Sequence, residues 1–443
     1  MPEEFTVAVT GDSMITRRLQ VHSEDRFLSL VKILRDADVA YTNLEMLIHD
    51  YEGPELYPSA EGAFTYMRAP RFVADELKWA GFDIVSTANN HSLDYSYGGL
   101  FSTWKALDEA GLVYAGTGMN LGEARAPAYL DTGKGRVALI SMCSSFARWG
   151  SAGEVRRDVK GRPGLNPLRF YYKVDAKTLE TLKQFATKAG WEITQAGKTW
   201  LFFPAGTAMS FFRFVETDEP GFTPIADEDD IEANLRSIRD ARRQADYVLV
   251  HLHNHEVDPD EGMETPAKFV PPFARACIDA GADVFIGQGS HAPLRGIEVY
   301  KNKPIFYDPG DFIAMADTVT RLPSDYYWRP GFNPEVRRWE ATTADGFDAR
   351  KDIRHASGIR AAPPLGSGAI VAAIIGVCSF QDSGLTEFKF YPVRLVWTTR
   401  SRTGLPLLAE PEVAKKITER LAQLSAPFGT KIEFKDGIGV VKL

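Results

Sequence analysis

The alternation of short apolar runs with stretches of helical spacing most constrains what this chain can fold into. Strands that alternate with helices form βαβ units, whose helices cover a largely parallel sheet. Helices are expected at 27–34, 71–80, 99–110, 226–245, 267–281 and 411–424. The apolar runs that predict strands lie at 5–12, 37–45, 82–90, 112–116, 136–146, 246–256, 282–291, 296–300 and 303–313. The sequence therefore predicts an α/β fold.

Two irregular segments, at about 147–226 and 316–365, interrupt this pattern. After them, residues 368–380 and 385–397 are typical of an antiparallel strand pair near the edge of the sheet. We predict a single α/β domain over residues 1–443, in which the two insertions are loop regions that form a cap or a substrate-binding region.

The insertions are rich in aromatic residues and hold five of the eight tryptophans, Trp149, Trp191, Trp200, Trp328 and Trp339. These aromatic residues could build a small core within each insertion. Alternatively, they could line a substrate site together with arginines that bind a carboxylate or phosphate in bidentate fashion. The candidate arginines are Arg157, Arg162, Arg213, Arg329 and Arg338.

Charge and cysteine content exclude several classes of protein. The chain has 51 Lys and Arg against 59 Asp and Glu, a net charge of −8, which argues against broad binding to nucleic acid. The longest apolar run, 369–380, is too short to span a bilayer, and the N-terminus lacks the features of a signal peptide. Cys143, Cys277 and Cys378 match no metal or redox spacing. We expect a cytoplasmic protein with reduced thiols and no membrane segment.

Polar side chains cluster where the predicted strands end. In α/β sheets the carboxyl ends of the strands converge, and ligands bind there. The residues at these ends are Asp12, Asn43, Glu45, Asn89, Asn90, His91, Asp94, His251, His253, His255, Glu256, Gln288 and His291. A succession of carboxylate, amide and imidazole groups indicates a metal or acid/base centre, since these ligands suit divalent Mn, Fe or Zn.

Some of these residues also have a purely structural interpretation. Asp12 could cap the helix that follows it. We favour a buried structural role for His251. The acidic run Asp227–Asp230 is interpreted as the start of a helix, because acidic side chains are favourable near a helix N-terminus.

Several motifs, in this order along residues 5 to about 315, resemble the CapA (poly-γ-glutamate capsule synthesis, PGA_cap) family of the calcineurin-like metallophosphoesterase superfamily. They are GDSM at 11–14, TNLE at 42–45, TANNHSLDYSYGG at 87–99, YAGTGMNLGEARAPA at 114–128, HLHNHE at 251–256, GADVFIGQGSHAPLRGIEVY at 281–300 and KPIFYDPGDFI at 303–313. The resemblance implies a four-layered α/β/β/α sandwich with a dinuclear metal centre.

The resemblance also implies roles for individual residues. Asp12 and His291 would bind the first ion, Asn90 and His253 the second, and Glu45 would bridge them. His91 would be the general acid or a phosphate-contacting histidine, oriented by Asp94. His255 with Glu256 would support the site or donate a further proton. Four residues are expected to contact the substrate: Asn89, Gln288, Glu256 and Asp311.

The sequence departs from the family pattern at two places. Gln288 stands where the family usually has His, and residues 308–311 read DPGD in place of Ser-Leu-Gly-Asn. An amide is a weaker ligand for these metals than imidazole. The centre is therefore expected to hold one or two ions of Mn, Fe or Zn, or none. Gln288 itself could be inert, a displaced ligand or a substrate contact.

The leading functional hypothesis is a hydrolase whose metal-assisted water attacks an amide (γ-glutamyl or peptide-like), ester or phosphoester bond. Its substrate would be a small or peptide-like molecule that carries carboxylates. One alternative is a metal-independent acid/base enzyme, such as a peptide α-carbon epimerase, in which Asp12, His91 and His291 carry protons. Another is a non-catalytic accessory protein of poly-γ-glutamate or capsule synthesis. The sequence does not indicate the oligomeric state.

Overall fold

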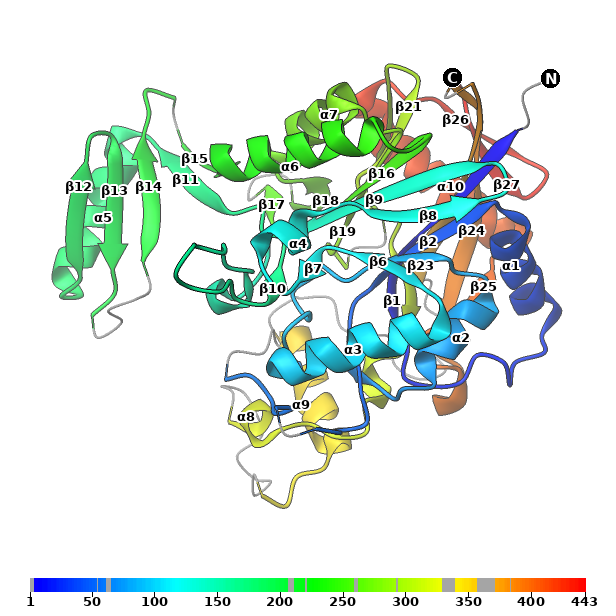
Figure 1. Cartoon of the computed structure of the whole chain (residues 1–443), viewed down its shortest axis with the longest axis horizontal. Helices are drawn as coiled ribbons and strands as arrows, with labels where there is room; N and C mark the ends of the chain where they lie inside the picture. The colour runs from blue at the N-terminus through cyan, green and yellow to red at the C-terminus, as the bar shows by residue number, and fades with distance from the viewer. Residues whose placement is uncertain are drawn as a thin grey trace.

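The computed structural model describes residues 4–53, 55–60, 65–205, 211–219, 221–258, 262–291, 294–328, 339–356, 371–382 and 384–443. Two large β-sheets form its centre, and helices pack against them (Figure 1). The predicted α/β class is confirmed, and the chain forms an α/β sandwich.

The larger sheet has ten strands among the described residues, and β1 (Phe5–Met14) lies in its interior. On one side β1 begins a parallel series with β2 (Val39–Leu44), β5 (Ile84–Ser86) and β6 (Val113–Ala115). On its other side lie β23 (Val371–Gln381), β24 (Gly384–Val396), β27 (Ile438–Val441) and β26 (Ile432–Lys435), all antiparallel to their neighbours. Two short strands, β22 (Asp311–Ala314) and β25 (Leu405–Leu408), pair with β1 and β24.

The smaller sheet contains six strands, of which the four central ones are parallel. Their order is β20 (Ile297–Tyr300), β21 (Lys303–Phe306), β19 (Val284–Gln288), β16 (Tyr247–His253), β9 (Gly135–Cys143) and β8 (Ala128–Thr132). Since β16 and β19 run in register, His253 lies directly beside Gln288. The two sheets therefore each bring parallel strand ends, with their polar residues, to one region.

Three apolar clusters hold the sandwich together. The central cluster joins the two sheets, with Val7 and Leu249 among its fully buried members, and α10 (Pro411–Ser425) packs into it. A second cluster packs α1 (Asp25–Asp36) and α2 (Val73–Ala80), with the end of α3 (Ser96–Ala110), on the larger sheet. A third packs α6 (Glu228–Arg242) and α7 (Val270–Ala280) on the smaller sheet. Figure 1 shows α6 and α7 on the opposite side of the molecule from α2 and α3.

The first insertion is more ordered than its sequence indicates. The expectation of an irregular segment is wrong for the described residues between 170 and 226, which form a five-stranded sheet and a helix that project from the body (Figure 1). Its elements are β12 (Glu192–Ala196), β13 (Thr199–Phe203), β14 (Phe212–Glu216), β11 (Phe170–Val174), β15 (Phe222–Ala226) and α5 (Ala176–Lys188). Each of its strands has only five residues and is half-exposed. The alternation of apolar and polar residues that marks a strand is therefore weak in the sequence.

The aromatic residues of this insertion form a core of their own. Trp191 and Trp200 pack against a buried cluster that includes Phe202 and Phe214. This packing agrees with the first interpretation of the aromatic residues. Among the candidate arginines, Arg213 pairs with Asp227, Arg162 donates to the Ser151 carbonyl and Arg157 is exposed. Arg329 and Arg338 of the second insertion lie outside the described residues.

The C-terminal part contains one confirmed element and one correction. The helix predicted at 411–424 is confirmed as α10, which buries Ile417 and Leu421. Strands β23 and β24 do form the predicted antiparallel pair, but their expected place near the sheet edge is wrong. The pair is interior because β1 covers one side of it, while β25, β26 and β27 extend the sheet on the other.

The acidic run Asp227–Asp230 does begin a helix. Asp227 caps α6 by accepting a hydrogen bond from the main chain of Asp229, at 3.2 Å. Asp230 is fully buried, where it pairs with Arg125 and Arg169 and so ties the insertion to the body. Within the described residues, no helix has the length and apolar character needed to cross a bilayer, and the three cysteines are buried and unpaired.

A β-bulge in β1 positions the end of that strand. Val9 pairs with Tyr41 and Asp12 with Asn43, so residues 10 and 11 of β1 face the single residue Thr42 of β2. The Gly310 carbonyl approaches Gly11 so closely that a Cβ at position 11 would lie 1.5 Å from its oxygen. Only glycine fits at this crossing.

We expect Gly11→Ala to lower the free energy of unfolding by on the order of 3 kcal/mol, because the backbone of β1 or of Gly310 must move. Urea denaturation followed by circular dichroism measures this change. Gly133→Ala is the matched control, since a Cβ at Gly133 meets nothing within 4 Å. Equal loss of stability in both variants would contradict the steric explanation.

Candidate metal centre

The polar strand ends of the two sheets meet at one buried site. Asp12 at the end of β1 accepts a hydrogen bond from Asn43 Nδ2 of β2, at 2.7 Å. The same amide nitrogen lies 3.3 Å from His253 Nδ1, at the end of β16 in the other sheet. Asp12, Asn43 and His253 are almost completely buried. The sheets therefore bring together residues that are more than 200 positions apart in the sequence.

Glu45 lies at the centre of this site. Its Oε1 atom is 3.5 Å from His291 Nε2, 3.7 Å from His253 Nε2 and 3.9 Å from His91 Nε2. Both carboxylate oxygens are buried, and neither accepts a hydrogen bond from any described residue. Burying a carboxylate without donors costs free energy, which a bound cation would offset.

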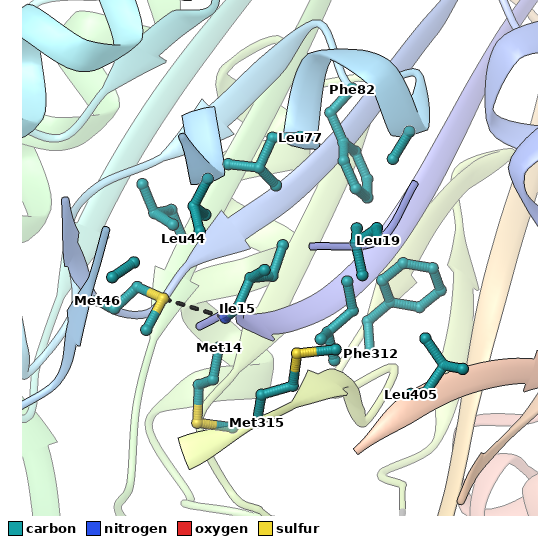
Figure 2. Packing of buried hydrophobic residues seen from close by; sticks show 14 of the residues in the cluster. Met14, Ile15, Leu19, Leu44, Met46, Leu77, Phe82, Phe312, Met315 and Leu405 are labelled. Carbon is teal, nitrogen blue, oxygen red and sulfur yellow. Dashed lines mark hydrogen bonds between the residues drawn. The ribbon is translucent and has the colours of Figure 1, made fainter. Parts of the chain in front are cut away.

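The chain around Glu45 is held firmly. Figure 2 shows Met46 beside the main chain of Ile15, whose N–H donates to Met46 Sδ at 3.0 Å. The surrounding side chains, including Met14 and Met315, are buried in the cluster beneath the larger sheet. This packing fixes the segment after β2 against the end of β1, and thus fixes the two carboxylates of the site.

His91 and Asp94 form a buried pair in the turn between β5 and α3. His91 Nδ1 lies 2.6 Å from Asp94 Oδ2, which also accepts the main-chain N–H of Met67. A carboxylate on Nδ1 fixes the orientation of the imidazole and leaves Nε2 directed toward Glu45. Asp94 thus lies against His91 Nδ1, and its role in orienting a general acid stays a prediction.

The two neighbouring asparagines differ in their contacts. Asn89 donates from Nδ2 to the Leu44 carbonyl at 2.8 Å and accepts the His91 main-chain N–H at 3.1 Å, so it links the segments that carry Glu45 and His91. Asn90 Oδ1 is buried and has no hydrogen-bond donor among the described residues. Metal binding by Asn90 and substrate contact by Asn89 both stay predictions.

His291 is held by Asp311 in an unusual backbone conformation. Its Nδ1 lies 3.0 Å from Asp311 Oδ1, so the pair repeats the arrangement of His91 and Asp94. His291 has φ +48°, in the left-handed region that few residues other than glycine adopt. Asp308 stabilises the loops on both sides by accepting hydrogen bonds from Ser290 and Gly310. Asp311 therefore orients His291, and its predicted contact with substrate stays a prediction.

His255 and Glu256 follow β16. His255 Nε2 lies 3.0 Å from His253 Nε2. The Glu256 carboxylate accepts hydrogen bonds from the hydroxyls of Ser144 and Ser145, which follow β9. The predicted roles of Glu256, in support of the site and in substrate contact, stay predictions.

Gln288 and His251 both connect strands. Gln288 Nε2 donates to the Thr10 carbonyl at the bulge of β1, at 2.7 Å, and the side chain is fully buried. His251 is also fully buried, with Nδ1 2.9 Å from Ser141 Oγ. The predicted structural role of His251 agrees with this position.

Burial and neighbouring charges shift the pKa values of the site residues. Burial raises the pKa of Asp12 well above its usual value, and the nearby carboxylate of Glu45 adds to this. Burial also raises the pKa of Glu45, although His291 opposes the effect. Burial lowers the pKa of His253 well below its usual value. Burial would lower the pKa of His291 too, but Glu45, Asp311 and Asp12 outweigh it and raise this pKa to about 10.

The residues present fit a divalent metal. In the described chain, three sets of side chains have ligand atoms within 4.8 Å of one another: Asp12, Glu45 and His253; Glu45, His255 and His291; and Asp12, His291 and Asp311. Carboxylate and imidazole ligands together suit Zn, Mn or Fe. With the donor-free Glu45 carboxylate, these sets could hold a metal.

Three supporting contributions were not predicted from the sequence: those of Asp308, Arg295 and the pair Ser144 and Ser145. Asn43 was named among the polar strand ends, but no role was assigned to it. Arg295 is fully buried and donates to the Met263 carbonyl and to Asn254 Oδ1. No local pattern distinguishes it from a surface arginine, because its partners are distant in the sequence.

The fold is an α/β sandwich whose strand ends bring together acidic and histidine side chains that could hold a metal. The chain belongs to the family described as "Bacterial capsule synthesis protein PGA_cap", whose model matches residues 6–316. The predicted family is thereby confirmed, and the match includes every candidate site residue.

Known relatives span a range of similarity. An uncharacterized protein of Sinorhizobium fredii, y4sH, is 33% identical over 442 residues, which cover 99% of this chain and 93% of that protein. The capsule biosynthesis protein CapA of Bacillus anthracis is 24% identical over 70% of this chain and 60% of its own length. A probable polyglutamine synthesis accessory protein of Mycobacterium tuberculosis is 28% identical over 52% of this chain and 44% of its own length. A crystal structure from Thermus thermophilus, with a TM-score of 0.39 and 13% identity over 88% of this chain and 99% of that one, is too distant to bear on function.

The donor-free carboxylate predicts how Glu45→Gln changes metal binding. We expect wild-type protein to gain about 2.7 kcal/mol of stability when free Zn²⁺ or Mn²⁺ is at 100 times its Kd. Glu45→Gln should lose most of this gain, because a neutral amide binds these ions weakly. Denaturation of both proteins with and without metal measures this metal-dependent gain in the free energy of unfolding.

Glu419→Gln is the matched control, since Glu419 is exposed on α10 and should leave the metal-dependent gain unchanged. A gain of wild-type size in Glu45→Gln would show that this carboxylate does not bind the ion.

Proposed function

We propose that this protein is a metal-dependent hydrolase that cleaves an amide bond in a carboxylate-bearing, γ-glutamyl or peptide-like substrate. The observation that carries the proposal is the buried Glu45 carboxylate, which lacks donors and has three imidazoles within 4 Å. Asp12, Glu45, His253 and His291 would hold the ion, and Asn90 Oδ1 offers a further ligand. Membership of a capsule synthesis family supports a role related to capsule or poly-glutamate synthesis.

A divalent ion bound there would supply an activated water and would polarise the carbonyl or phosphoryl oxygen under attack. The chain's own residues then handle the proton that the leaving group needs. His91 is suited to this, because Asp94 holds its Nδ1 and leaves Nε2 on the side of Glu45. Asn89 and Asp311 keep the His91 segment and His291 in place.

The choice of an amide rests on two considerations. An amide nitrogen leaves only when it is protonated, so a positioned acid such as His91 matters most for this bond. One relative is named a probable polyglutamine synthesis accessory protein, and a polymer of glutamine residues is joined by amide bonds, which also favours an amide. The same water could attack an ester or a phosphoester, so these remain the comparison substrates.

We expect His91→Asn to lower kcat for a γ-glutamyl amide by about 10²–10⁴-fold while metal content stays unchanged. The same variant should lose far less activity on a nitrophenyl ester or phosphate, because nitrophenolate leaves without a proton. Steady-state kinetics on the three substrates, with metal analysis of each preparation, test this. Asp94→Asn should lower kcat for the amide by a smaller factor, and it should likewise affect the nitrophenyl ester and phosphate less than the amide.

His22→Asn is the matched control, since His22 lies outside the site, near Glu24. Wild-type kcat on the amide in His91→Asn would contradict the acid role. Metal-loaded wild-type protein that turns over none of the three substrates would instead favour the non-catalytic accessory role. Activity that persists after complete metal removal would favour metal-independent acid/base chemistry.

A further inference from the structure

We infer that His255 is itself a metal ligand in this protein, beside Glu45 and His253. The inference rests on the proposed metal-dependent function and adds a ligand that the family resemblance does not assign. It changes the role of His255 from support or proton donation to direct coordination.

The spacing of the imidazole nitrogens is the main argument. His255 Nε2 lies 3.0 Å from His253 Nε2. Two nitrogens bound to one ion at about 2.0–2.1 Å lie roughly 2.9–3.4 Å apart when the angle at the ion is between the octahedral and tetrahedral values. The observed distance falls in this range. The rings of His255 and His291 are also neighbours, with centroids 5.0 Å apart.

The position of Glu45 gives independent support. Glu45, His255 and His291 have ligand atoms within 4.8 Å of one another, and Glu45 is fully buried with both oxygens lacking donors. A carboxylate with no protein donor beside three imidazoles fits a shared cation better than it fits a hydrogen-bonded histidine pair. His255 is therefore placed to complete a set of nitrogen and oxygen ligands around one metal ion.

The loop that carries His255 is held in place by the protein itself. The His255 main-chain N–H donates to Ser145 Oγ at 2.6 Å. The fully buried Arg295 donates from Nη1 to Asn254 Oδ1 at 2.9 Å and from Nη2 to the Glu256 carbonyl at 3.2 Å. Residues on both sides of His255 are thus held by buried hydrogen bonds, as a preorganised ligand requires.

The neighbouring strand explains why a ligand is needed from this loop. Gln288 ends β19 beside His253, but its amide nitrogen is bonded to the Thr10 carbonyl. The end of β19 thus contributes no imidazole to this side of the site. His255, two residues beyond the end of β16 at His253, supplies one from the loop that follows this strand.

Metal binding by His255→Ala tests the inference without reference to activity. The Kd for Zn²⁺ is measured by chelator competition, and the visible absorption of Co²⁺-loaded protein reports the ligand set. We expect His255→Ala to weaken Zn²⁺ binding by at least about 100-fold and to change the Co²⁺ spectrum. His255→Asp, which retains a ligand at this position, should recover part of the affinity.

His22→Ala is the control and should keep the wild-type Kd and spectrum. Wild-type affinity and spectrum in His255→Ala would overturn the inference and leave the proposed function standing. If wild-type protein binds neither Zn²⁺ nor Co²⁺, the proposed function fails, and the inference fails with it. Should His255→Ala lack a folded circular dichroism spectrum, His255→Gln is measured in its place, with the same loss expected.

Discussion

The β-bulge at Thr10 and Gly11 is the constraint on which the site depends. Before it β1 pairs with β23, and after it β1 pairs with β22, so the strand changes partner within a few residues. Side chains satisfy the oxygens at this irregularity: Thr42 Oγ1 donates to the Gly11 carbonyl, and Gln288 Nε2 donates to that of Thr10. Bulges re-aim the side chains beside them, and here Asp12 is brought to Asn43 and His253. This single β-bulge thus connects both sheets to the candidate metal centre.

The site concentrates groups that are costly to bury. Asp12 and Glu45 bring two carboxylates into a region almost without solvent, and the raised pKa values of both express that cost. The surrounding apolar clusters contribute stability that offsets the cost of burying the two carboxylates. His291 adds a left-handed backbone to the same region. Such a concentration of charge and strain is typical of sites shaped by ligand binding rather than by folding alone.

Much of this arrangement was predictable from the sequence, for reasons that differ between elements. The carboxyl ends of parallel strands converge, so the polar residues that follow each apolar run are enough to indicate the site. The contact of Gln288 with Thr10 was not predictable, because these residues are 278 positions apart and no local pattern connects them. The interior place of β23 and β24 depends on β26 and β27, which have only four residues each. The projecting sheet was not predicted, because apolar and polar residues alternate only weakly along its short, half-exposed strands.

The projecting five-stranded sheet has a consequence for how such a protein can diversify. It has an apolar cluster of its own and is tied to the body through charged pairs such as Arg169 with Asp230. Sequence changes on its exposed face, around Phe185 and Phe212, therefore affect a part of the chain that has its own apolar core. Related chains can vary this module, and a library can randomise its surface, while the strand ends that carry the ligands keep their positions.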